Sequence, residues 1–452
     1  MKRCCALLLL CLLLLSGCGG QKAEAPFEGT TLTLATWLSG GEPIDSLVRR
    51  FNESHTDIHI ELMDFTPEDL SQAAASLDQA HASFVAGNTP DLYYTVSFDA
   101  AKLRNAGLVA DWYPLMEADP DFDPEDYQTH IWELLETDGA LYQLCTAFDL
   151  FGTGGPAALV GDRTGWTLAE FEDWLSGHAE EVTVTGERML QLMLWYGCQF
   201  DFIDTETLSC DFENQDFLDW LDFLGRLPQT GTSSLRVARF DGPWMHGIDA
   251  TGMDTVEDWS HPERWQFLRY VGLPTAGRDG PAVAITDSFA LSSTTEKTEA
   301  CWTFIRWMLS EETQTTLYTM TYAPTTEFEE DEPRTLAIPI RKDVWEEQLR
   351  CAGLDSSHED SLFVGMGSYE WPDEDDGEPV ETPRPGLPQA ELDYLRDLVA
   401  NANRTAMGFF DYESLTKIIE EEVLAFLAGD RSAADCARLI QSRVGIMLAE
   451  MQ

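Results

Sequence analysis

The sequence predicts an α/β fold in which helices cover a parallel sheet. Two observations support this class. The chain has 452 residues, of which 44% are hydrophobic, so it is globular and long enough for two to three domain-sized units. Near its N-terminus, strand-like and helix-like patterns follow one another in the order strand, helix, strand, helix, strand. Such alternation is typical of parallel sheets covered by helices.

The first five elements follow from side-chain spacing. Residues 31–37 alternate between polar and apolar side chains, which predicts a strand. A helix is expected from Pro43, because proline suits a first helical turn and apolar residues follow at helical spacing. Residues 58–62 alternate again and predict a second strand, the next helix is expected over 68–85, and residues 90–94 enter a third strand.

The middle of the chain is richer in helix. Thr167 and Glu170 form a capping box, which predicts a helix immediately after it. Apolar spacing predicts another helix over 214–227. The remaining expected elements are strands at 283–286 and 289–291, a helix capped by residues 293–296, and a last helix capped by Ser432 and Asp435. Between them, residues 325–390 are expected to form an acidic and proline-rich surface excursion with patches of order.

The first residues predict export. Lys2 and Arg3 precede a short apolar run, and small residues follow it, which is the pattern of a signal peptide. The run is shorter than the roughly 20 residues that span a bilayer. Its end, Leu-Ser-Gly-Cys, resembles the bacterial lipobox, which implies a signal peptide over 1–17, lipidation of Cys18 and a tether over 18–26. The alternative is a plain secretory signal with an incidental cysteine.

The charge of the chain excludes one class of partner. There are 80 acidic and 28 basic residues, and the formal net charge is −52. Such a chain repels phosphate backbones, so nucleic-acid binding is not expected. It also repels anionic lipid headgroups, which excludes polybasic attachment to a membrane. The simplest interpretation of the excess acid is a well-solvated surface.

The cysteine and carboxylate patterns predict no metal site. Six cysteines follow Cys18, none in a Cys-x-x-Cys pair or beside a histidine at metal spacing, and their disulfide state stays open. Asp119, Asp121 and Asp123 imitate the start of a calcium loop, but Pro124 replaces the glycine that this loop requires. We expect no cofactor and no metal.

Several short motifs follow one another along the chain. Residues 51–53 are Phe-Asn-Glu before an alternating strand, residues 86–91 are Ala-Gly-Asn-Thr-Pro-Asp, and residues 300–305 are Ala-Cys-Trp-Thr-Phe-Ile. With the lipobox-like start, this ordered series resembles family 1 extracellular solute-binding proteins, the maltodextrin-binding-like lipoproteins of carbohydrate ABC importers. Residues 145–149 depart from the family pattern of the crossing segment, which puts the usual cleft residues there in doubt, and 325–390 match no part of it.

The resemblance implies a periplasmic-binding-protein-like fold of type II. Two α/β lobes would be joined by crossing strands and would close on a ligand like a hinge. The N-terminal lobe would take residues 27–142 and 286–323, and the C-terminal lobe 143–285 and 324–452.

Candidate ligand-binding residues follow from position and from the resemblance. Ligands of open α/β sheets lie at the carboxyl ends of strands, where Trp37, Glu42 and Tyr94 are expected. The alternative role of each is packing between lobes. Asp241 and Trp244 belong to a segment that resembles the family's Gly-x-Trp, and Asp149 and Asp287 flank the presumed hinge strands. Aromatic rings and carboxylates suit sugars, which have apolar faces and a rim of hydroxyls.

The predicted function is therefore binding without catalysis. We expect a monomeric solute-binding protein, anchored by lipid to the outer face of the cell membrane, that captures a carbohydrate, most simply an oligosaccharide, for the permease subunits of an ABC importer. The alternatives are a surface-anchored glycan hydrolase, for which the many carboxylates offer too many candidate pairs to be informative, and the same fold adapted to a peptide or another solute.

Overall fold

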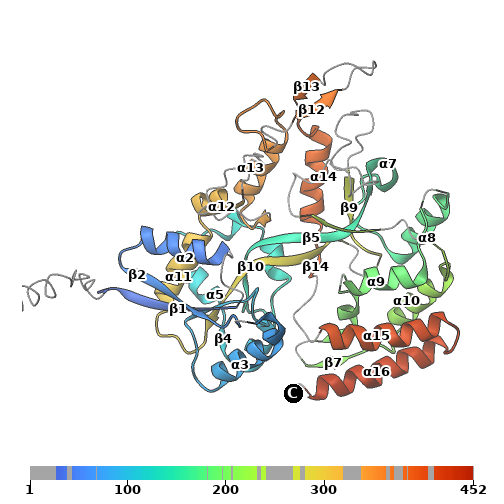
Figure 1. Ribbon diagram of the computed structural model, residues 1–452, viewed down its shortest axis with the longest axis horizontal. Coiled ribbons are helices and arrows are strands. Elements are labelled where there is room, and N and C mark those ends of the chain that lie inside the picture. Colours follow the sequence, from blue (N-terminus) through green and yellow to red (C-terminus); the bar gives the residue numbers. More distant parts are fainter. Residues whose placement is uncertain are drawn as a thin grey trace, which may run out of the picture.

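The computed structural model describes residues 27–37, 43–67, 69–180, 182–195, 197–204, 207–231, 236–240, 268–274, 280–318, 337–362, 367–370, 380–383, 385–405 and 412–450. Figure 1 shows two groups of helices, with the long strands β5 (Leu144–Pro156) and β10 (Ala282–Ser292) running between them. No helix in these ranges is long and apolar enough to cross a membrane.

Ten of the described strands form one mixed sheet. Besides β5 and β10, these are β1 (Thr30–Thr36), β2 (Ile58–Asp64), β3 (Leu92–Tyr94), β4 (Val109–Ala110), β8 (Arg236–Phe240), β9 (Leu268–Val271), β11 (Ile338–Pro339) and β14 (Arg404–Thr405). The main path of the sheet is β11-β5-β10-β3-β1-β2. β1 is parallel to both β2 and β3, which confirms the predicted parallel arrangement of the first three strands.

Strands β5 and β10 connect the two groups of helices. They pair antiparallel with each other, from Leu144 opposite Phe289 to Phe151 opposite Ala282. The second half of β5 continues into pairs with β8 and β9, whereas the second half of β10 pairs with β3 and β4. The register between β5 and β10 shifts on both sides of Asp287. Each long strand therefore belongs to both ends of the molecule.

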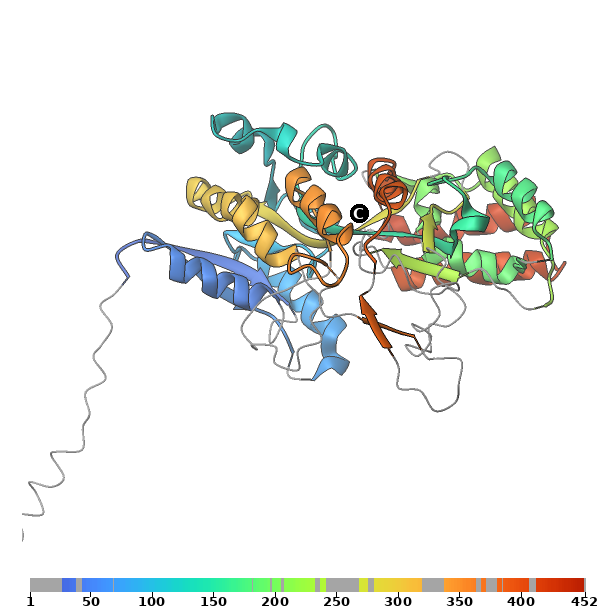
Figure 2. The same ribbon diagram turned by 90° about the horizontal axis from the view of Figure 1, so that it is seen from above.

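Helices of the first lobe cover both faces of β1–β3. Leu32 and Leu34 of β1 face one core, whereas Ala35 faces a second core, because successive strand residues point to opposite sides. Around these cores lie α2 (Pro43–Ser54), α3 (Ala73–Val85), α4 (Ala100–Asn105), α5 (Tyr113–Ala118), α6 (Thr129–Glu133), α11 (Thr298–Met308) and α12 (Glu311–Tyr318). The first core continues to α13 (Lys342–Ala352), which lies beside β11, and to α14 (Gln389–Ala400), which contacts β9. Both views show α2 and α11 side by side (Figures 1 and 2).

A third core belongs to the second lobe. It is formed by the apolar faces of helices that are drawn in green and red at the other end of Figure 1. These helices are α8 (Leu168–Gly177), α9 (Gly186–Trp195), α10 (Gln215–Arg226), α15 (Tyr412–Leu427) and α16 (Ala433–Glu450), with the short α7 (Ala157–Val160) beside them. Two short hairpins, β6 (Ile203–Asp204) with β7 (Ser209–Cys210) and β12 (Gly367–Glu370) with β13 (Val380–Pro383), complete the described strands.

The Ala-Gly-Asn-Thr-Pro-Asp motif lies between α3 and β3, and its last residue, Asp91, connects three segments. Gly87 ends α3 with φ +97°, a conformation that favours glycine. Asp91 then accepts hydrogen bonds from the backbone nitrogen of Thr33 at 2.9 Å, from the Thr295 hydroxyl at 2.6 Å and from Lys297 Nζ at 2.9 Å. One carboxylate thus joins β1, the start of β3 and the segment before α11.

Local signals predicted many helix ends correctly. Thr167 and Glu170 form the expected capping box before α8, and Asn214 caps α10. Ser432 accepts a hydrogen bond from the backbone nitrogen of Asp435 at the start of α16, as expected. The helix expected to be capped by residues 293–296 instead begins at Thr298, because the Thr295 hydroxyl donates to Asp91 and accepts from the backbone nitrogen of Lys297.

The stretch 325–390, expected as a surface excursion with patches of order, contains a buried helix. Val344, Trp345 and Leu349 of α13 are each at most 4% exposed. Together with α14, this helix packs into the same core as β1–β3. The expected division of the chain between the two lobes stays a prediction. The six cysteines whose disulfide state was left open, Cys145, Cys198, Cys210, Cys301, Cys351 and Cys436, are free thiols.

Candidate functional site

Two predicted site residues lie at one edge of the sheet. Because β1 and β3 are parallel neighbours, their carboxyl ends meet at the same edge, which is where open α/β sheets hold ligands. Trp37 follows the end of β1, and Tyr94 is the last residue of β3. The expected placement of both residues at strand ends is therefore confirmed. Whether either contacts a ligand stays a prediction.

Trp37 is held with part of its ring exposed. Its indole nitrogen donates to the Ser76 hydroxyl of α3 at 3.1 Å, and its backbone oxygen accepts from the Ser97 hydroxyl at 2.8 Å. The Ser76 hydroxyl in turn donates to the backbone oxygen of Phe65 at 2.5 Å. These contacts fix the plane of the ring from α3 and from the turn after β3, and the side chain remains half-buried.

Two further aromatic side chains belong to the same cluster and were not predicted as site residues. Phe65, just after β2, and Tyr142, just before β5, are half-buried and pack against the core that Trp37 contacts. Tyr142 lies two residues before the start of β5. Nothing in its local spacing indicates that Tyr142 packs against the same core as Trp37, because the two residues are far apart in sequence.

Tyr94 and Asp287 are brought into direct contact. The Tyr94 hydroxyl donates to Asp287 Oδ1 at 2.5 Å, and the Tyr318 hydroxyl of α12 donates to Oδ2 at 2.8 Å. The aspartate is 3% exposed and lies where the register of β10 shifts. Burial, and then the charge of Asp287, raise the pKa of the Tyr318 phenol well above its ordinary value, so this phenol stays protonated and donates a hydrogen bond to the carboxylate. Tyr318 was not predicted.

Polar contacts around this pair tie the linking strands to the first lobe. The Thr95 and Ser288 hydroxyls are 2.7 Å apart, and Gln143 Nε2 donates to the same Ser288 hydroxyl at 2.9 Å. Gln314 Nε2 of α12 donates to the backbone oxygen of Thr146 on β5 at 3.0 Å. The structure places Asp149 on β5 opposite Ala284 of β10, fully buried, at the middle of the link between the lobes.

The remaining predicted residues lie outside the described part of the chain. These are Glu42, Asp241 and Trp244 of the expected binding site and Cys18 of the expected lipid anchor. Among the described residues, no group of three or more His, Cys, Asp or Glu side chains could hold a metal ion. Asp119, in the calcium-like run, accepts from the Trp302 indole at 2.9 Å and pairs with Arg306 at 3.1 Å, so it joins α11 to the turn after α5.

The described thiols are not activated nucleophiles. Burial raises the pKa of each of the six cysteines beyond Cys18, and the pKa of Cys145, near the start of β5, lies well above its ordinary value. A thiol with a raised pKa stays protonated at neutral pH and is a poor nucleophile. What this edge of the sheet offers is a positioned, partly exposed indole, together with a buried carboxylate whose two oxygens already accept from phenols.

Comparisons with known proteins identify the fold. No family model and no curated protein matches the sequence. Among solved structures, the sugar-binding protein MalE from Xanthomonas citri aligns with a TM-score of 0.57 at 14% identity, over 93% of this chain and 98% of its own. An extracellular solute-binding protein family 1 from Alicyclobacillus acidocaldarius aligns with a TM-score of 0.57 at 12% identity, over the same shares. A designed cysteine esterase, ECH19, aligns with a TM-score of 0.54 at 11% identity, over 94% and 99%.

These likenesses extend over nearly the whole length of both chains in each comparison. The mixed sheet shared by two groups of helices is thus the arrangement of the solute-binding proteins, and the predicted fold class is confirmed. Because the designed esterase has the same architecture, the fold does not by itself separate binding from hydrolysis. This chain has the two-lobe fold of the family 1 extracellular solute-binding proteins.

Proposed function

We propose that this protein is a lipid-anchored extracellular solute-binding protein that captures a carbohydrate by closure of its two lobes and delivers it to an ABC importer. The observation that carries the proposal is Trp37, held half-exposed by Ser76 and Ser97 at the carboxyl edge of the sheet in a fold whose lobes share β5 and β10. A flat indole at that place suits the apolar face of a sugar ring. A monomer suffices for this role.

The neighbouring groups support a neutral ligand. A net charge of −52 disfavours anionic solutes by long-range repulsion. The Tyr142 phenol, which packs against the same core as Trp37, can both donate and accept hydrogen bonds, as sugar hydroxyls require. The raised pKa values of the six described thiols argue against a cysteine hydrolase on this fold.

Binding and cleavage are separated by one experiment. The full chain, solubilised in detergent, is mixed with a panel of neutral oligosaccharides, and its melting temperature and the chemical fate of each sugar are recorded. A ligand that binds only the native state raises the melting temperature. At a ligand concentration of 100 times its Kd, the free energy of unfolding increases by about 2.7 kcal/mol. Stabilisation without products is expected. Products formed at catalytic turnover would contradict the binding proposal and show that the protein is a hydrolase.

Trp37→Ala tests the named residue. Loss of stacking should weaken binding about tenfold while leaving the unliganded protein folded, whereas Trp37→Phe should retain most of the affinity. Trp174 provides a matched control, because it is also half-buried and its indole also donates a hydrogen bond, to the backbone oxygen of Leu159 in the other lobe. Equal loss from Trp37→Ala and Trp174→Ala would remove Trp37 from the site.

The anchor is tested separately. Cys18→Ser should move the protein from the membrane fraction to the medium, because the thiol that would carry the lipid is gone, and sugar binding should be unchanged. Membrane retention of that variant would contradict the lipid anchor without affecting the binding proposal.

A further inference from the structure

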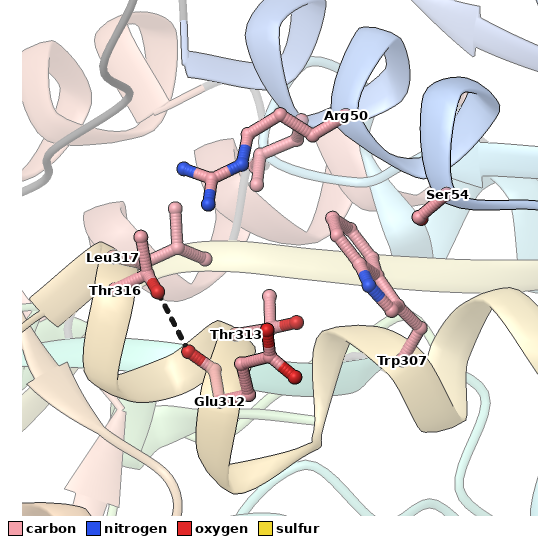
Figure 3. Close-up of a pocket in the computed structure, with 8 residues that line it drawn as sticks. Arg50, Ser54, Trp307, Glu312, Thr313, Thr316 and Leu317 are labelled. Carbon is pink, nitrogen blue, oxygen red and sulfur yellow. Dashed lines mark hydrogen bonds between the residues drawn. The ribbon is translucent and has the colours of Figure 1, made fainter.

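A pocket lies between α2, α11 and α12, on the helical layer of the first lobe (Figure 3). It has a volume of about 110 Å³. Arg50 and Ser54 reach it from α2, Trp307 from α11, and Glu312, Thr313 and Thr316 from α12. Figure 3 shows the Trp307 ring standing between the α2 side chains and Thr313, with the guanidinium of Arg50 over α12.

This pocket is separate from the candidate site at the carboxyl edge of the sheet. α2 begins after the carboxyl end of β1 and ends before the amino end of β2, and the two strands are parallel. The Ser54 end of α2 therefore lies at the opposite edge from Trp37. The pocket contacts the core of β1–β3 only through buried side chains such as Leu47.

Trp307 is held in place from its protein side. Its ring meets Phe51 of α2 edge-on, with centroids 5.5 Å apart, and stacks at 6.2 Å on Phe304 of its own helix. The side chain is nevertheless only half-buried. An indole that is fixed by two aromatic neighbours and still open on the pocket side offers a rigid apolar surface at little cost in side-chain entropy.

The polar rim favours a neutral, hydroxyl-rich ligand. Arg50 donates hydrogen bonds only, and the described residues give it no ion pair. The exposed Glu312 carboxylate accepts only. The Ser54 and Thr316 hydroxyls already donate to the backbone oxygens of Phe51 and Glu312, so toward a ligand they accept, whereas Thr313 can also donate. An anion would be repelled by Glu312 and by the strongly negative net charge of the molecule, and a cation would be repelled by Arg50.

The volume limits the size of the occupant. Sites for drug-sized ligands occupy about 300–1,000 Å³, whereas a cavity of about 150 Å³ accepts one benzene ring. A pocket of about 110 Å³ that opens to solvent therefore takes one ring at most.

We propose that this pocket binds a single neutral sugar ring, with the apolar face of the ring on Trp307 and its hydroxyls on Arg50, Glu312 and the threonines of α12. It would hold a monosaccharide or the end of a longer glycan, outside the site between the lobes. The inference stands on the pocket alone and does not depend on the proposed transport function.

The test uses the full chain in detergent with 5-fluorotryptophan in place of tryptophan. The chain has 14 tryptophans, and the fluorine resonance of Trp307 is assigned by its disappearance in Trp307→Phe. Methyl glycosides of glucose, galactose and mannose are the probes. With at least one of them the Trp307 resonance should shift and saturate with a Kd on the order of 10 mM, as expected for one partly exposed ring.

Variants outside the aromatic cluster keep the test decisive. Arg50→Ala should raise the Kd measured from the saturable shift about tenfold. Arg49→Ala, which changes the exposed neighbour on the same helix, should change that Kd less than twofold. No saturable shift with any glycoside at about 100 mM would overturn the proposal. So would equal effects of Arg50→Ala and Arg49→Ala, or a larger shift with sodium acetate than with the glycosides.

The two proposals can fail independently. Trp37→Ala should leave the Trp307 shift unchanged, because the two tryptophans lie at opposite edges of the sheet. Oligosaccharide-induced stabilisation without a Trp307 shift would support the transport function and overturn this inference. A Trp307 shift in a protein that no oligosaccharide stabilises would do the reverse.

Discussion

Asp287 lies at the irregular point of β10 and accepts one phenol hydrogen bond on each carboxylate oxygen. Tyr318→Phe removes the donor 2.8 Å from Oδ2 but keeps the aromatic ring. Because Asp287 is 3% exposed, water does not readily replace that donor. We expect the variant to lose about 1–3 kcal/mol of stability in urea unfolding.

Tyr113 offers the matched control for that experiment. Its hydroxyl also donates to a carboxylate, that of Glu136, but the tyrosine is only half-buried. Water can solvate Glu136 after Tyr113→Phe, so the loss should be less than about 1 kcal/mol. Equal losses from the two variants would show that burial does not strengthen the contact at Asp287.

Asp91 predicts a pH dependence at the same scale. Burial opposes its ionisation, but hydrogen bonds from Thr295 and Lys297 outweigh that effect and hold the pKa of this carboxyl below its ordinary value. The folded state therefore binds fewer protons than the unfolded state, whose pKa is about 3.9. The stabilisation from Asp91 is complete above that pH and is lost as pH falls through the folded value.

The comparison of wild type with Asp91→Asn measures this contribution. The variant should be less stable at neutral pH, and the difference should shrink by about pH 3, where the carboxyl begins to bind a proton. Urea unfolding at both pH values gives the two differences. A gap of constant size would mean that the charge of Asp91 does not contribute to stability.

At the scale of elements, a buried ion pair holds α14 against β9. Arg269 Nη2 and Glu391 Oε1 are 2.8 Å apart, both side chains are 8% exposed, and the guanidinium lies 4.4 Å from the centre of the Tyr394 ring. Glu391→Gln removes the buried counter-charge, although Asp162 still pairs with Arg269 from the surface. We expect a loss of about 2–3 kcal/mol.

A second ion pair on α14 provides the contrast. Arg396 and Glu346 also bond through several atoms, at 2.8 to 3.0 Å, but their side chains are 35% and 51% exposed. Glu346→Gln should therefore cost less than about 1 kcal/mol and should lose its effect in high salt. A cost as large as that of Glu391→Gln would contradict the role given to burial.

The same scale shows what could be predicted from sequence. Alternation and capping are local signals, so β1, α2, α8 and α10 could be predicted from neighbouring residues alone. α13 was hidden because acidic and proline-rich segments flank it, and its burial depends on a core built by distant strands. Likewise, Tyr94 and Tyr318 meet Asp287 only through the pairing of β10 with β3 and the packing of α12, which no local pattern records.

Taken as a whole, the molecule is two lobes joined by strands that belong to both. The resemblance predicted this architecture, since the order of motifs reflects the order of elements. The exact division between lobes stays a prediction, and the packing of α13 and α14, which follow the second crossing in sequence, was harder to predict: both join the core that contains β1–β3, while α14 also pairs with β9. Packing of a late segment onto an early core is decided by surface complementarity over long sequence separations.

The charge of the whole molecule gives the last prediction. With 80 acidic and 28 basic residues, most carboxylates lack a cationic partner, so repulsion opposes the compact state. Raising the ionic strength from about 0.01 M to about 0.15 M shortens the Debye length from about 30 Å to about 8 Å and screens that repulsion. The melting temperature should rise over this range, equally in NaCl and KCl, because screening depends on ionic strength rather than on ion identity. A fall in melting temperature would mean that attractive pairs such as Lys297 with Asp91 contribute more to stability than the net repulsion between carboxylates takes away.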